Sequence, residues 1–190
     1  MARCSNFIVG VPLNSNVRLP KRVSNLVAVL GTDHSYQIGG DERTDAQNRA
    51  FAELIHTLCQ EHQVRLLAEE MSLDALEGRG RTESTVAGFA RDLCIAHVYC
   101  DPSEAEQSAM GLYIERSENL LVHKKWSADK IAEGIAKEHG VRERFWMNRM
   151  IETNVWPCLL VCGSDHAHSI CSLLHNAGLT VTLLAVRWDA

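Results

Sequence analysis

Short, nearly continuous apolar runs alternate with longer amphipathic segments along most of this 190-residue chain. An apolar run of five to eight residues that lacks a polar face is typical of a strand covered on both sides, as in a parallel sheet. We therefore expect five strands, at residues 26–30, 64–68, 95–100, 155–161 and 179–186.

Between these strands, apolar residues recur three and four positions apart, which is the spacing of a helix with one buried face. This spacing predicts helices over residues 43–62, 84–93, 142–153 and 166–177. Ser127 is expected to begin another helix that ends at Gly140, because glycine is favoured just past a helix end. Residues 103–126 are charged and show only an early helical tendency.

The alternation of strands and helices predicts an α/β fold with a mostly parallel sheet, helices on both of its faces and three layers in all. The length suits one domain with a substantial core. We assign residues 26–190 to a single α/β domain and residues 1–25 to an N-terminal arm or edge strand.

The same short pattern follows two of the expected strands. Gly31-Thr32-Asp33-His34 comes after the first strand and Gly163-Ser164-Asp165-His166 after the fourth. We expect Gly163 to allow a sharp exit from its strand by taking a positive φ. Ser164 or Asp165 is then expected to cap the helix that follows.

The carboxyl ends of parallel strands lie along one edge of a sheet, where ligands bind in open α/β folds. His34, Glu69, Glu70, Asp101 and His166 all follow strands, so we expect them to share that edge. Since neighbouring strand residues point to opposite faces, only one of the two glutamates is expected to enter a site. Structural explanations compete with this one: a helix cap or surface position for each histidine, a solvated strand end for the glutamates, and a turn at Asp101.

Further candidates lie close to these strand ends. Arg142 is expected to stabilise developing negative charge on a substrate, and Arg144 is a weaker candidate for the same task. Tyr36 and His168 follow the two Gly-x-Asp-His patterns, and we assign them with Asp101 and Arg144 to substrate binding.

Composition and charge exclude several classes of function. The formal net charge of −5 gives no basic footprint for nucleic acid, and no run of about 18 apolar residues could span a membrane. The seven cysteines form no Cys-x-x-Cys pair, which favours a reducing compartment and neither a disulfide framework nor a structural zinc site. We therefore expect a cytoplasmic protein, with a homodimer as an open alternative to the monomer.

The two Gly-x-Asp-His patterns resemble the two Gly-x-x-His motifs of the superfamily that includes TraB/Tiki, ChaN and erythromycin-esterase proteins. Ala68-Glu69-Glu70 resembles its glutamate after the second strand, and Arg142-Glu143 its arginine-led helix. The resemblance covers residues 26–185 and implies an α/β fold with a His/Glu site. It also implies hydrolytic activity in several branches: Tiki-type members are metal-dependent proteases, and erythromycin esterases open a lactone with a histidine as general base. ChaN-type members bind haem.

These observations predict a hydrolase that cleaves an amide, ester or lactone in a small-molecule or peptide substrate. His34, Glu70 and His166 are the candidate ligands of a divalent cation such as Zn²⁺, Mn²⁺ or Co²⁺, which would activate water. Without a metal, an imidazole held by Glu69 or Glu70 would act as general base, with Arg142 beside it. The alternatives are a non-catalytic pocket for a nucleotide, haem or small signal, and cysteine chemistry at Cys162.

Overall fold

The computed structural model describes residues 25–39 and 43–190, and within them it confirms the α/β fold. Five strands form one sheet, in which every neighbouring pair is parallel. The strands are β1 (Leu26–Thr32), β2 (Leu66–Glu69), β3 (Ala96–Tyr99), β4 (Cys158–Gly163) and β5 (Thr180–Trp188), in the order β3-β2-β4-β1-β5. The arm or edge strand expected at the N-terminus falls on residues 1–24, outside the described residues.

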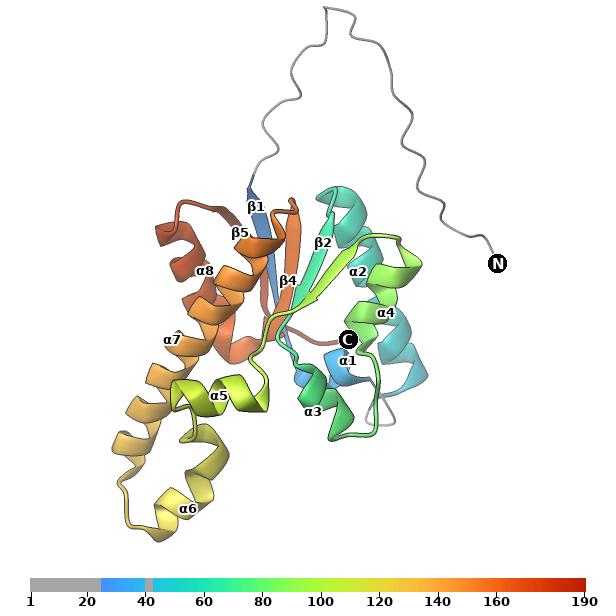
Figure 1. Ribbon diagram of the computed structural model, residues 1–190. Helices are drawn as coiled ribbons and strands as arrows, with labels where there is room; N and C mark the ends of the chain where they lie inside the picture. The colour runs from blue at the N-terminus through green and yellow to red at the C-terminus, as the bar shows by residue number, and fades with distance from the viewer. Residues whose placement is uncertain (1–24, 40–42) are drawn as a thin grey trace, which may run out of the picture.

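Helices cover both faces of the sheet, which gives the three predicted layers (Figure 1). One face carries α7 (Ala128–Thr153) and α8 (Ala167–Asn176), and the other carries α1 (His34–Ile38), α2 (Asp45–Glu61) and α4 (Thr85–Asp92). The remaining helical segments are α3 (Leu73–Glu77), α5 (Glu104–Met110), α6 (Glu118–His123) and two short 3₁₀ turns, η1 (Glu115–Ser117) and η2 (Ser164–His166).

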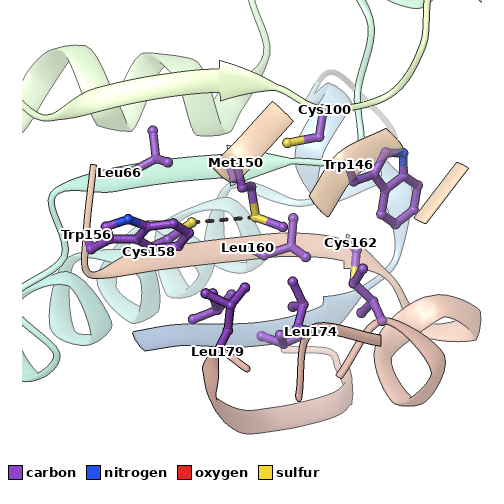
Figure 2. Close-up of a cluster of buried hydrophobic side chains, with 14 residues drawn as sticks. Leu66, Cys100, Trp146, Met150, Trp156, Cys158, Leu160, Cys162, Leu174 and Leu179 are labelled. Carbon is purple, nitrogen blue, oxygen red and sulfur yellow. Dashed lines mark hydrogen bonds between the residues drawn. The ribbon is translucent and has the colours of Figure 1, made fainter. Parts of the chain in front are cut away.

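The core consists of two apolar layers, one on each side of the sheet, and alternate residues of a strand supply them. Val27 and Val29 of β1 pack with α7 and α8, whereas Ala28 and Leu30 pack with α1, α2 and α4. Figure 2 shows the first layer, in which Leu160 of β4 lies among side chains of neighbouring elements. Burying a leucine or valine completely contributes about 1.5–3 kcal/mol, so these layers stabilise the sheet that positions the site.

The prediction of two helices separated at Gly140 is wrong, because α7 is one helix of 26 residues. A glycine inside a helix costs only about 1 kcal/mol relative to alanine, which the packing of a long helix can offset. The buried side of α7 includes Glu138 and Glu143 as well as Trp146 and Met150. Because two of these residues are charged, the apolar pattern by itself did not reveal one continuous face.

Segment 113–115 is attached to α7 through one buried carboxylate. Glu138 accepts hydrogen bonds from the backbone N–H groups of Tyr113 (2.7 Å), Ile114 (2.8 Å) and Glu115 (3.2 Å). α6, which follows this segment, lies beside the amino-terminal end of α7, away from the sheet (Figure 1). This attachment fixes η1, and with it Glu115, beside the carboxyl edge of the sheet.

Candidate functional site

The three central strands end level with one another, so the residues that follow them meet. In the parallel registers, Thr32 of β1 pairs with Gly163 of β4, and Glu69 of β2 pairs with Val161 of β4. Glu70 directly follows β2, His34 lies two residues after the end of β1, and His166 lies three residues after the end of β4. They line a cleft of about 780 Å³, whose opposite wall comes from α3, α5, η1 and α7. This volume lies within the range of about 300–1,000 Å³ that is usual for small-molecule sites.

Glu70 is the centre of the site, and its side chain is 2% exposed. Its Oε1 accepts a hydrogen bond from Arg142 Nη2 at 2.7 Å, and its Oε2 accepts one from the backbone N–H of Gly163 at 2.7 Å. The Nε2 atoms of His166 and His34 lie 3.4 Å and 3.7 Å from Oε1. One buried carboxylate thus connects the ends of β1, β2 and β4 with α7.

His166 is buried and held from its far side. Its Nδ1 lies 2.8 Å from Glu143 Oε1, which also accepts a hydrogen bond from Ser169 Oγ at 2.6 Å. The ring packs edge-on against Trp146, with 4.7 Å between the ring centroids. Burial lowers the pKa of His166, but the hydrogen bond with Glu143 and the charge of Glu70 outweigh this and raise the pKa above its ordinary value. These contacts therefore favour the imidazolium form of His166 more than an ordinary histidine environment would.

Arg142 joins three carboxylates. Besides Glu70, it donates to Asp101 Oδ1 at 2.9 Å and to Glu115 Oε2 at 3.0 Å, and Trp146 Nε1 also donates to Asp101. Burial opposes the charge of Arg142, but Asp101 and Glu70 raise its pKa above the usual range. A guanidinium fixed in this way is a permanent positive charge in the wall of the cleft.

His34 differs from His166 because its side chain is 50% exposed. It is the first residue of α1, whose N-cap Asp33 accepts hydrogen bonds from the backbone and side chain of Ser35. These bonds hold the pKa of Asp33 at about 2. Of the two motif histidines, His34 is the more accessible to a ligand in the cleft.

Gly163, the glycine of the second motif, allows neighbouring side chains to pack close to its Cα atom. It does not adopt an unusual backbone angle. The expectation of a positive φ at Gly163 is wrong, since its φ is −61°. A Cβ atom at Gly163 would lie 2.8 Å from His34 Nε2 and 3.2 Å from Glu70 Oε2. The expected caps are also wrong: the Ser164 and Asp165 side chains do not cap α8, because η2 separates them from it.

Glu69 lies on the opposite face of the sheet from Glu70, as expected for neighbouring strand residues. Its Oε1 accepts hydrogen bonds from Ser84 Oγ, the N-cap of α4, and from His97 Nε2 at 2.7 Å. Burial raises the pKa of Glu69, although His97 and Ser84 oppose this. Glu69 does not line the cleft.

The structure also places three of the four residues assigned to substrate binding outside the cleft. Tyr36 is buried against Phe51 and Trp188, and its hydroxyl donates to Asp189 Oδ1 at 2.6 Å. Arg144 and His168 are exposed on outer faces of α7 and α8, because the helical period turns them away from Glu143 and His166. Asp101 does line the cleft, where it is a partner of Arg142.

The donor set does not fit the predicted metal. Within residues 25–39 and 43–190, no group of three or more His, Cys, Asp or Glu side chains is arranged to hold a metal ion. Both oxygens of Glu70 are already engaged, one by the cationic Arg142 and the other by the Gly163 N–H group. A divalent cation at Glu70 would therefore stand beside a fixed positive charge, which disfavours its binding.

Cysteine chemistry at Cys162 is disfavoured by the environment of its thiol. Cys162 is fully buried within β4, and burial raises its pKa well above the usual range. A nucleophilic thiolate requires the opposite shift and access to solvent.

Three residues of the cleft network were not among the candidates: Glu143, His139 and Glu115. His139, Arg142, Glu143 and Trp146 are spaced i, i+3, i+4 and i+7, which places them on one face of α7. The helix break expected at Gly140 hid this spacing. The helical spacing of these residues was therefore present in the sequence. It indicates a shared helix face only if residues 128–153 form one helix.

No family model, curated protein or solved structure matches this chain. The resemblance to the TraB/Tiki, ChaN and erythromycin-esterase superfamily thus stays a prediction. Among the helices that the structure describes, none combines the length and apolar character needed to cross a membrane.

Proposed function

We propose that this protein is a hydrolase that cleaves an ester, lactone or amide by activating water with a histidine, without a metal. The observation that carries the proposal is the convergence of His34, His166 and Arg142 on the Glu70 carboxylate, inside a cleft at the carboxyl edge of the sheet.

His34 is the proposed general base. Its ring is half exposed in the cleft, and Glu70 lies near enough to orient it and to stabilise the charge that it gains on accepting a proton from water. The contact of 3.7 Å is longer than a hydrogen bond, but catalytic contacts in free enzymes often tighten only when substrate binds.

Arg142 and His166 supply positive charge beside the reacting centre. Carboxylates of the described residues engage three of the five N–H groups of the Arg142 guanidinium, so the other two can donate to a developing oxyanion. His166 is buried, its Nδ1 is paired with Glu143 and its Nε2 faces Glu70, which suits it to balance Glu70 rather than to act as a base.

The test is hydrolysis of 4-nitrophenyl acetate, ethyl acetate, γ-butyrolactone and acetanilide by the purified chain. We expect turnover of at least one substrate, and a loss of about 10²–10⁴-fold in kcat for His34→Ala, the usual contribution of a general base. His168→Ala is the matched control, because His168 is an exposed histidine outside the cleft.

Two results would overturn the proposal. One is the absence of turnover with every substrate, and the other is equal turnover by wild type and His34→Ala. Treatment with EDTA is expected to leave turnover unchanged, whereas a loss restored by Zn²⁺, Mn²⁺ or Co²⁺ would support the metal-dependent version instead.

A non-catalytic binding pocket is the second candidate function. The observation that favours it is that both oxygens of the Glu70 carboxylate already have hydrogen-bond donors within the protein. A side chain fixed in this way suits the rigid wall of a binding pocket as well as a catalytic site. In this case a ligand would raise the Tm of the protein, no tested bond would be cleaved, and His34→Ala would change affinity alone.

A further inference from the structure

One imidazole in the cleft has no role in the mechanism above. His139 of α7 lines the same cleft, and its ring packs against that of His166 with 4.1 Å between centroids. Its Nε2 is buried and has no hydrogen-bond partner among residues 25–39 and 43–190, and Glu115 Oε1 lies 3.6 Å away. A buried polar atom without a partner is rare in folded proteins and calls for an explanation.

The fold brings Glu115 and His139 together from two separate elements. Glu138, the residue before His139, accepts the backbone N–H groups around Glu115 and so fixes η1 against α7. Arg142 then holds the Glu115 side chain through its Oε2, which leaves Oε1 facing His139. His139 and Arg142 lower the pKa of Glu115 to about 2, so this carboxylate is charged at neutral pH.

His34 and His139 are two ends of one chain of contacts. From His34 the contacts pass to Glu70, then to His166, and from the His166 ring to His139. The side chain of His139 is 19% exposed, so part of the ring is open to the cleft. A base and an acid on two sides of a bond are the pair that hydrolysis of a poor leaving group requires.

We propose that His139, whose ring faces the Glu115 carboxylate, is the catalytic acid that protonates the leaving group. This inference rests on the proposed hydrolase function. His34 removes a proton from water, the water oxygen bonds to the acyl carbon, and the carbonyl electron pair moves to its oxygen beside Arg142. As that pair returns, the bond from carbon to the leaving oxygen or nitrogen breaks, and that atom takes its electron pair and the Nδ1 proton of His139, since the buried Nε2 faces Glu115. The products are a carboxylic acid and an alcohol or amine, and solvent carries the proton on His34 back to His139.

The experiment compares two esters that share an acyl group but differ in leaving group. 4-Nitrophenolate leaves without protonation, whereas ethoxide does not. In His139→Gln we expect kcat/KM for ethyl acetate to fall by about 10²-fold or more, while that for 4-nitrophenyl acetate changes by less than about threefold. Glu115→Gln should show the same split with a smaller loss, and His168→Gln, on an exposed position, should show none.

The outcomes separate this inference from the proposed function. If His139→Gln slows both esters equally, or neither, the catalytic acid is refuted while His34→Ala can still show that the protein is a hydrolase. An equal loss would identify His139 as a packing partner of His166. Retained turnover of 4-nitrophenyl acetate also shows that the variant is folded. If the wild type hydrolyses neither ester, the inference fails together with the proposed function.

Discussion

The two Gly-x-Asp-His turns have nearly the same sequence, yet their histidines occupy different environments. His34 begins α1, is half exposed and has Glu70 as its nearest charged neighbour, whereas His166 lies in a 3₁₀ turn, is 4% exposed and is held by Glu143. The difference comes from what covers each turn. The long helix α7 passes over the second turn and supplies Glu143, Arg142 and Trp146, and it supplies no comparable partner to the first. A motif of four residues therefore does not determine the state of its histidine.

The largest expected difference is in stability after loss of each ring. His166→Ala leaves the buried Glu143 without its imidazole partner, and removing one partner of a buried pair costs about 3–5 kcal/mol. His34→Ala removes a half-exposed side chain and should change the free energy of unfolding by less than about 0.5 kcal/mol. Urea unfolding of both variants measures this, and equal losses would show that the two turns do not differ as described.

Replacing Gly31 of the first motif should mainly reduce stability, whereas replacing Gly163 of the second motif should mainly reduce turnover. A Cβ at Gly31 would overlap with the backbone carbonyl of Val186 in β5, which cannot move without its strand. We expect Gly31→Ala to destabilise the protein by about 1–3 kcal/mol and Gly163→Ala by less, because the atom nearest the new Cβ at Gly163 is the movable end of His34 and not backbone, with Glu70 Oε2 next at 3.2 Å. Gly163→Ala should instead lower turnover by up to about 10²-fold by displacing His34. Thermal unfolding and ester hydrolysis of both variants test the contrast, which a stability loss confined to Gly163→Ala would contradict.

The two aspartates should differ as helix caps. Asp33 accepts the Ser35 N–H at the start of α1, so Asp33→Ala should cost about 1 kcal/mol. Asp165 caps no helix, and Asp165→Ala should lie within about 0.5 kcal/mol of the wild type. Chemical unfolding at neutral pH compares the pair. Similar losses in both variants would mean that the second turn is capped in solution.

The smallest expected difference is in pH dependence. Because the folded-state pKa of His166 is raised, its contribution to stability is fully present below about pH 6.5 and is lost as pH rises through the folded pKa. The lowered pKa of Asp33 acts in the opposite direction: its contribution is present above its unfolded pKa of 3.8 and is lost as pH falls toward 2. Unfolding free energies of Glu143→Gln and Asp33→Asn, each subtracted from the wild type across pH, should show the alkaline and the acid change respectively. A pH-independent difference in either case would contradict the assigned contact.

Glu69 and Glu70 at the end of β2 also show that residues with the same side chain can occupy different environments. Glu69 and Glu70 have equal side chains, but Glu69 is enclosed with Ser84 and His97 and Glu70 faces Arg142 and both motif histidines. Strand alternation in the sequence predicts that they separate. It does not say which of them reaches the cleft, because this depends on which face of the sheet α7 covers.

The sequence by itself determined the strand and helix alternation, the parallel sheet and the edge at which His34, Glu70 and His166 meet. Apolar periodicity and chain direction are local properties, and they suffice for these conclusions. Only the tertiary structure decided that α7 continues through Gly140, that Glu143 and Glu115 join the network, and that Arg142 stands where a cation was expected. These three features depend on contacts between residues far apart in the chain. A buried charged side chain is stable there because another element supplies its partner.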